Sequence, residues 1–321
     1  MPRIASTLTL QETTALTRRV TQLSVATALV LSAIKLAAWL VSGSVAMLAS
    51  LADSGLDVLA ALAAYFAVRY AAEPPDREHR FGHGKAEAFA SLVQAGLVFA
   101  SAALIGREAV ARILRPQPID HQGWGMAVMA VSIVLTGALI WAQSRVLRKA
   151  NSVAVSGDRM HYLADLASNL IAFAGIGMSA ALANPLADSV GGLIVAALLV
   201  WGAVNVFRGA SLELMDHELD DESRRRIAAL MMSDPRIRDV RHLRTRASGP
   251  YIHVQMHAEL ESALSLVEAH AVIVAAERRI LQAFPSADII IHPDPPGHAE
   301  PHGGAFPEVH EAEALETAKN R

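Results

Sequence analysis

The sequence predicts a membrane all-α bundle of six transmembrane helices, followed by a small cytoplasmic α+β domain of ferredoxin-like or metallochaperone-like type. Three observations lead to this fold class. The 321 residues are 53% hydrophobic and only 18% charged, which is more apolar than an ordinary soluble protein of this length. Six apolar runs are each long enough to cross a bilayer, which takes roughly 20 residues. After about Gly209 the composition changes, and charged residues become frequent.

The six apolar runs define a predicted membrane domain, residues 20–208. They cover residues 20–41, 45–68, 88–114, 124–146, 162–183 and 186–207. Residues 1–19 are polar and have no apolar core followed by a small-residue cleavage site, so we expect a cytoplasmic lead-in and not a signal peptide.

Cations are distributed unevenly among the connections between the runs. Most lie in the second-to-third and fourth-to-fifth connections: Arg69, Arg77, Arg80, Lys85, Arg145, Arg148, Lys149 and Arg159. The turns near residues 42–44 and 184–185 have no Lys or Arg. Because cytoplasmic loops carry an excess of Lys and Arg, both termini are predicted to lie in the cytoplasm.

The second predicted domain covers residues 209–297. Helical spacing, alternating apolar residues and turn residues indicate the order α-β-β-α-β, with elements at residues 222–232, 240–246, 251–259, 265–284 and 288–292. Residues 298–321 are rich in Pro, Gly, Glu and His and have no apolar periodicity, which predicts a disordered tail.

Composition also excludes some chemistry. The chain has no cysteine, so disulfides and thiolate metal sites are excluded, and a metal would be held by imidazole and oxygen. The formal net charge is -3 and no long basic stripe is present, which argues against a nucleic-acid partner.

Two predicted spans carry matched pairs of polar residues. Asp53 and Asp57 are four residues apart, as are His161 and Asp165, so each pair shares one face of a helix. An ionised Asp in hydrocarbon costs roughly 2.5 to 3.5 kcal/mol, so the acids need a compensating cation or protons. Three carboxylates and one imidazole from two packed helices would make a four-ligand shell suited to tetrahedral zinc.

A blander interpretation of these residues is that they are helix ends near water, or polar contacts between spans. The two matched pairs favour the metal site over that alternative. Other charged residues in or near the spans are interpreted as interfacial or packing residues: Lys35, Arg107, Glu108 and Asp188.

The loop after the second run contains a further group of potential metal ligands, Asp76, His79 and His83. By itself this group is better explained as a solvated turn that contains histidines. The loop continues as Phe81-Gly-His-Gly-Lys-Ala-Glu87.

With Asp53, Asp57, His161 and Asp165, this loop resembles the cation diffusion facilitator family, and more closely its bacterial zinc and iron effluxers. The resemblance extends from the first apolar run to Asp294. It implies that the four intramembrane residues form the transport site and that the group in the loop forms a weaker site. It also implies a multi-pass protein of the bacterial inner membrane.

The resemblance further implies a homodimer. A salt bridge between Lys85 and Asp216 would lie near the dimer contact in the membrane. A two-metal site would lie where two copies of the cytoplasmic domain meet, formed by His242, His257, His270, His292 and Asp294.

The expected function is efflux of a divalent metal cation, with Zn²⁺ as both transported and regulatory ion, in exchange for protons and by alternating access. Cd²⁺, Fe²⁺, Co²⁺ and Mn²⁺ are compatible with the same donors. Metal and protons would compete, because the ligands bind metal only when deprotonated.

Two other classes remain open at this point. An intramembrane metalloenzyme would also use buried ligands, but no H-E-x-x-H helix is present, so we expect no enzyme activity. A metal sensor anchored by passive spans would have no use for buried acids in those spans.

Overall fold

The computed structural model describes the backbone of residues 8–42, 45–114, 123–182 and 185–298. Within these ranges it describes all side chains except those of residues 42, 45–49, 52, 112, 123–126, 172–182 and 185–189. The predicted tail from residue 299, the turn around residues 43–44 and part of the third-to-fourth connection lie outside the described residues, and so does the side chain of Asp188. The described chain forms two compact units, one made of Leu10–Asp216 and the other beginning at His217.

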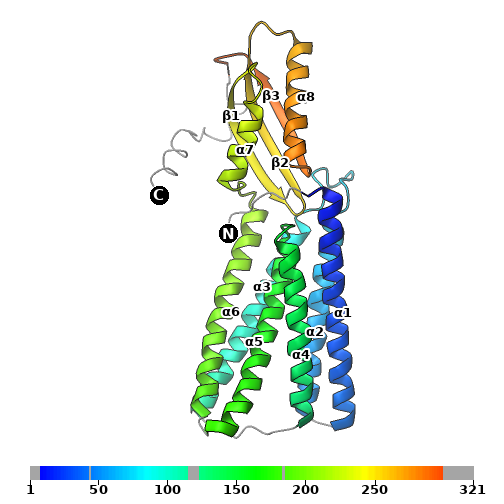
Figure 1. The fold of residues 1–321 in the computed structure, drawn as a ribbon, viewed down its shortest axis with the longest axis vertical. Coiled ribbons are helices and arrows are strands. Elements are labelled where there is room, and N and C mark those ends of the chain that lie inside the picture. The colour runs from blue at the N-terminus through cyan, green and yellow to red at the C-terminus, as the bar shows by residue number, and fades with distance from the viewer. Residues whose placement is uncertain (1–7, 43–44, 115–122, 183–184, 299–321) are drawn as a thin grey trace. The chain divides into compact units, whose positions relative to one another are not determined.

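Six long helices lie side by side in the first unit (Figure 1). They are α1 (Leu10–Ser42), α2 (Val45–Ala71), α3 (Ala86–Leu114), α4 (Gly123–Leu147), α5 (Val153–Leu182) and α6 (Pro185–Leu214). By length and apolar composition, five helices are able to cross a membrane in the described part of the chain, namely α1, α2, α3, α4 and α6. The predicted helical transmembrane region is therefore confirmed, whereas a count of six spans stays a prediction.

All six helices are longer than the apolar runs that predicted them, and three extend well beyond them. Helix α1 begins at Leu10, inside the predicted lead-in, and in this part Thr17 and Thr21 donate their hydroxyls at 3.0 Å to the carbonyl oxygens of Thr13 and Thr17. These bonds satisfy the polar side chains within the helix itself. Helix α5 begins at Val153 and α6 continues to Leu214, because Val153 and Ala210 are buried together beside Ala88.

The second unit has the predicted order α-β-β-α-β. Its elements are α7 (Asp221–Met231), β1 (Ile237–Ser248), β2 (Tyr251–Leu260), α8 (Leu266–Ala283) and β3 (Ala287–Asp294). The side chain of Asp220 caps α7 by accepting from the Ser223 N–H at 2.9 Å, and Ser265 and Glu268 form a capping box at α8.

The three strands form one sheet in the order β1-β2-β3. Strands β1 and β2 are joined by Gly249 and Pro250 alone, with Gly249 in the left-handed region at a φ of 56°. Strands β2 and β3 are parallel, connected through α8, with Val254 opposite Ile289 and His257 opposite His292. This register determines which side chains share a face.

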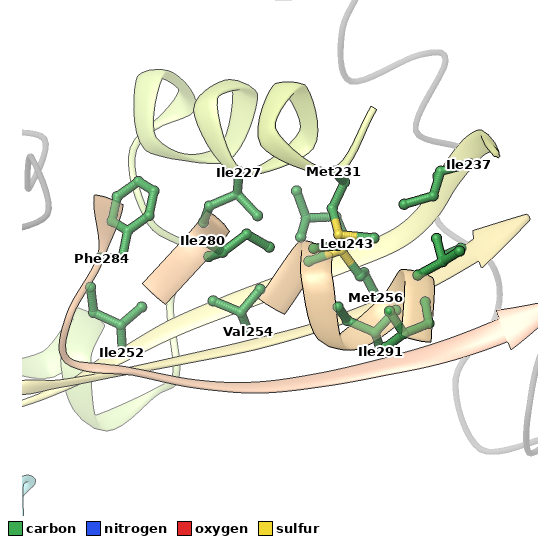
Figure 2. Packing of buried hydrophobic residues seen from close by; sticks show 14 of the residues in the cluster. Ile227, Met231, Ile237, Leu243, Ile252, Val254, Met256, Ile280, Phe284 and Ile291 are labelled. Atoms are coloured by element: carbon green, nitrogen blue, oxygen red, sulfur yellow. The ribbon is translucent and has the colours of Figure 1, made fainter. Parts of the chain in front are cut away.

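The two faces of the sheet differ in character. Alternate residues of β2 face an apolar core that α7 and α8 cover, where Ile227 and Ile280 approach Val254 and Met256 (Figure 2). The opposite face carries the other residues of β2 and β3, including His253, His257, His292 and Asp294. A cluster of potential metal ligands therefore lies on the polar side of a well-packed layer.

Candidate metal centres

The structure brings Asp57 of α2 together with His161 and Asp165 of α5. The distance from His161 Nε2 to Asp57 Oδ1 is 3.0 Å and to Asp165 Oδ2 is 3.8 Å. One ligand atom from each residue lies within 4.8 Å of the others. His161 is buried and both acids are partly buried. One helix supplies two donors one turn apart and its neighbour supplies the third, which is a geometry that can surround a single dication.

Asp53, the fourth predicted ligand, is exposed and does not belong to this group of three in the described part of the chain. It lies one turn before Asp57 on α2. The intervening Ser54 is buried and accepts a hydrogen bond from Lys35 Nζ of α1 at 2.6 Å, and Lys35 also donates to the Ser50 carbonyl oxygen at 3.3 Å. Lys35 therefore fixes α1 against the part of α2 that carries Asp53.

A fully buried acid that sequence reasoning missed lies one turn before His161. Asp158 accepts hydrogen bonds from the Nε2 of Gln143 at 2.8 Å and from the Nε2 of Gln94 at 3.4 Å. Gln143 Nε2 also donates to Ser24 Oγ at 3.2 Å. The Tyr162 hydroxyl donates to the Ser24 carbonyl oxygen at 3.1 Å. This polar cluster links α5 to α1, α3 and α4, one helical turn before the candidate ligand His161.

A signal for Asp158 was present in the sequence. It precedes His161 by three residues and Asp165 by seven, which places all three on one face of a helix. Gln94 and Gln143 are also polar residues inside apolar runs. In hydrocarbon such groups need partners, so their presence indicates an internal hydrogen-bonded cluster.

The loop between α2 and α3 brings together all three of its predicted ligands. Asp76 Oδ1 accepts from the backbone N–H of His79 at 2.6 Å and of Glu78 at 2.8 Å. The His79 bond is the main reason that the pKa of Asp76 lies below its usual value. His83 Nε2 lies 3.3 Å from Asp76 Oδ2, and the two histidine rings are 4.5 Å apart.

The buried His83 is oriented by the loop itself. Its Nδ1 lies 3.4 Å from the carbonyl oxygen of Glu73, so Nδ1–H can donate there and leave Nε2 facing Asp76. A second hydrogen bond of this kind commonly fixes the tautomer of a metal-ligating histidine. The loop thus presents one carboxylate and two ring nitrogens in a compact group.

The third group stands on the polar face of the sheet, at the end of β2 and β3. Asp294 Oδ2 lies 2.7 Å from His257 Nδ1, and its other oxygen lies 3.3 Å from His292 Nε2. The two rings are 5.0 Å apart, as expected for residues paired across neighbouring strands. Asp294 is buried, and each of its oxygens faces a different histidine, so the carboxylate is able to bridge two ions.

The remaining two predicted ligands of the cytoplasmic domain differ in position. His242 adopts a positive φ of 51° within β1, and its ring lies 5.2 Å from that of His257. A left-handed conformation at a residue other than Gly carries strain and is frequent at functional sites. His270 is exposed on α8 and belongs to none of the three groups among the described residues.

Two further pairs lie near these groups. Lys85 Nζ is 3.0 Å from Asp216 Oδ1 and also donates to the Leu214 carbonyl oxygen at 3.3 Å, so the predicted salt bridge forms within one chain. His253 Nδ1 lies 3.2 Å from Asp288 Oδ2 on the polar face of the sheet. Sequence reasoning assigned no role to His253, and its pairing follows from the register of β2 and β3.

Apolar spans with a buried histidine and carboxylate group define a class of membrane proteins that handle divalent cations. Comparison with known families agrees. Residues 21–215 match the cation efflux transmembrane domain, and residues 219–296 match the cytoplasmic domain of cation efflux proteins. The chain therefore belongs to the cation efflux family, the cation diffusion facilitators. This is a family of transporters and not of enzymes, which removes the metalloenzyme alternative.

Similar curated proteins are bacterial cation-efflux pumps named FieF. The FieF of Shewanella oneidensis is 41% identical over 272 residues, which is 85% of this chain and 92% of the relative. That of Klebsiella pneumoniae is 38% identical over 262 residues, 82% of this chain and 87% of the relative. That of Salmonella choleraesuis is 37% identical over 281 residues, 87% and 93% respectively. The chain is thus an integral membrane transporter for divalent cations.

Proposed function

We propose that this transporter exchanges zinc for protons through a site formed by Asp53, Asp57, His161 and Asp165. The observation that carries the proposal is the convergence of Asp57, His161 and Asp165 from two neighbouring helices. An imidazole and carboxylates are donors that tetrahedral zinc accepts, and cadmium, iron, cobalt and manganese compete for the same donors.

A short contact in the site supports proton exchange. His161 Nε2 and Asp57 Oδ1 are 3.0 Å apart, which is a hydrogen bond and requires a proton between them. A metal ion at Nε2 needs the same lone pair, so the metal displaces the proton and a returning proton displaces the metal. Loading and release are thereby coupled without covalent chemistry.

Alternating access would expose the site to each side of the membrane in turn. In this proposal α5 also crosses the membrane, which brings the number of spans to six. The membrane is the bacterial inner membrane, and both termini lie on its cytoplasmic side. Asp53 is one turn from Asp57, and a small movement of α2 along α5 would let it join the other three ligands in one of the two states. The exposed position of Asp53 motivates this assignment.

The other two groups would regulate transport. The group of Asp76, His79 and His83 would bind metal weakly beside the cytoplasmic end of α2. His242, His257, His270, His292 and Asp294 would bind two ions between the cytoplasmic domains of a homodimer. His270 would then coordinate metal from the partner copy, which agrees with its exposure and with its position outside the group on the sheet among the described residues.

Zinc flux into liposomes that carry the purified full chain tests the central assignment. Asp57→Asn removes one ligand charge and should reduce flux to the level of empty liposomes. Asp221→Asn, an exposed acid at the start of α7, is the matched control and should transport like the wild type. Unchanged flux in Asp57→Asn would remove this site from the transport pathway.

A second measurement tests proton coupling. Zinc added to the metal-free protein in weakly buffered solution should release protons, and Asp57→Asn should release fewer. Zinc transport without any proton release or uptake would refute the exchange, while leaving the position of the metal site intact.

A further inference from the structure

A groove with a volume of about 280 Å³ lies between α1 and α4, away from all three candidate metal centres. Its floor is apolar and is formed by side chains from both helices: Leu16, Val20, Leu23, Trp141, Ala142 and Val146. Both helices are apolar enough to cross a membrane. The groove therefore runs along the outer surface of two spans, where an acyl chain is the natural neighbour.

Three cations complete the lining at one end of these spans, namely Arg19, Arg145 and Lys149. Trp141, Arg145 and Lys149 follow one another at intervals of four residues and so lie on one side of α4 and its extension. The lining contains no Asp or Glu. Among the described residues, no Asp or Glu forms an ion pair with Arg19 or Arg145.

Trp141 joins the apolar and the charged parts of the groove. Its ring is exposed, and the Arg145 guanidinium stands 5.6 Å from its centre, so the cation is held where the apolar floor ends. Tryptophan is enriched at the membrane interface, at the level of lipid headgroups. The cations beside Trp141 are therefore at the depth where a lipid phosphate would lie.

We propose that this groove binds one anionic phospholipid, with the phosphate between Arg19, Arg145 and Lys149 and an acyl chain on the apolar floor. Basic pockets between transmembrane helices are known to select anionic headgroups. The bound lipid joins α1 to α4, and it acts on helix packing rather than on the metal. This site is independent of the identity of the transported ion.

Native mass spectrometry of the delipidated full chain, titrated with phosphatidylglycerol or phosphatidylcholine, tests the proposal. The wild type should bind phosphatidylglycerol more tightly. The double variant Arg19→Gln/Arg145→Gln should lose about thirtyfold of that preference, because it removes two direct charge-assisted contacts to the phosphate, each worth on the order of 1 kcal/mol. A matched control, Arg18→Gln/Arg148→Gln, removes two exposed cations next to the groove that do not line it.

The control pair should keep the wild-type preference to within about twofold, because these two cations do not line the groove and act on the phosphate only through screened surface attraction. Equal losses in both double variants would show general surface attraction and would overturn the site. Equal binding of the two lipids by the wild type would do the same. Size-exclusion profiles and circular dichroism establish that each variant is folded.

Competition with glycerol 3-phosphate distinguishes a lipid from a soluble phosphate as the occupant of the groove. It carries the headgroup charge without acyl chains, so it should not displace phosphatidylglycerol at equal concentration. Displacement by this soluble anion would overturn the lipid assignment, and so would binding of a second protein chain at the groove in place of lipid.

Discussion

The group between α2 and α5 and the group on the sheet use the same donors on different scaffolds. In the membrane, Asp57 meets His161 and Asp165 only because two separate helices pack together. On the sheet, His257 and His292 are fixed opposite each other by the hydrogen-bonded register of two strands. Helices can shift past one another without losing internal hydrogen bonds, whereas a strand register cannot shift without breaking them. The first scaffold suits a site that must open, and the second suits a site that stays formed.

The largest expected effects come from removing one acid from each group in turn. Asp165→Asn should reduce zinc flux by more than about a hundredfold, because even the outer partners of metal ligands contribute 10- to 100-fold. It should leave zinc binding by the cytoplasmic domain unchanged. Asp294→Asn should weaken that binding and still permit measurable flux.

Flux in liposomes and zinc binding by isothermal titration, both on the full chain, separate these outcomes. Loss of transport in Asp294→Asn as complete as in Asp165→Asn would contradict the division between a transporting and a regulatory group.

The sequence predicted the individual helices and strands better than it predicted how the helices pack against one another. Apolar runs located the helices of the membrane unit, and alternation located the strands, because these periodicities arise from local geometry. The spacing of His161 and Asp165 placed both on one face of α5, as the structure has it. Spacing also predicted that Asp53 would join them, and this stays a prediction: Asp53 is exposed, and the depth at which α2 meets α5 is set by packing and not by local spacing.

The partners of Asp158 could not be predicted for the same reason, although its spacing to His161 and Asp165 was visible in the sequence. Its partners Gln94 and Gln143 lie on other helices, 64 and 15 residues away in sequence, and no local pattern announces which helices will meet. The left-handed conformation of His242 was equally hidden, because sequence periodicity says nothing about a single irregular residue in a strand. Local order was predictable, and contacts between distant segments were not.

The polar cluster around Asp158 gives the next largest expected effect and tests how the helical scaffold is held. Asp158→Leu would remove the acceptor that the buried amide groups of Gln94 and Gln143 share and would leave Gln143 with Ser24 alone, which costs about 1 to 3 kcal/mol. The thermal unfolding temperature in detergent should therefore fall, and zinc flux should fall with it because α5 is no longer held. Asp158→Asn keeps an acceptor oxygen and should recover most of the stability.

Rescue of both stability and flux by Asn would indicate a positioning role. Stability restored by Asn with flux still absent would instead indicate that the carboxyl group itself handles protons or metal, and the cluster would have to be counted as part of the site.

The smallest expected effect concerns the acid stability of the sheet scaffold. The Arg236 guanidinium donates to Asp234 at 3.0 and 2.8 Å and lowers the pKa of Asp234 to about 2, just before β1 begins. An unfolded Asp titrates near 3.9. Since the folded pKa is the lower one, Asp234 stabilises the domain above about pH 4, and this contribution is lost as the pH falls through about 2.

Asp234→Asn should accordingly speed hydrogen exchange in β1 and β2 at pH 7, with the difference from wild type shrinking below pH 4. A difference that persists unchanged at low pH would mean that Asp234 acts through its shape and not its charge. The rigidity assigned to the sheet would then rest on its apolar core alone.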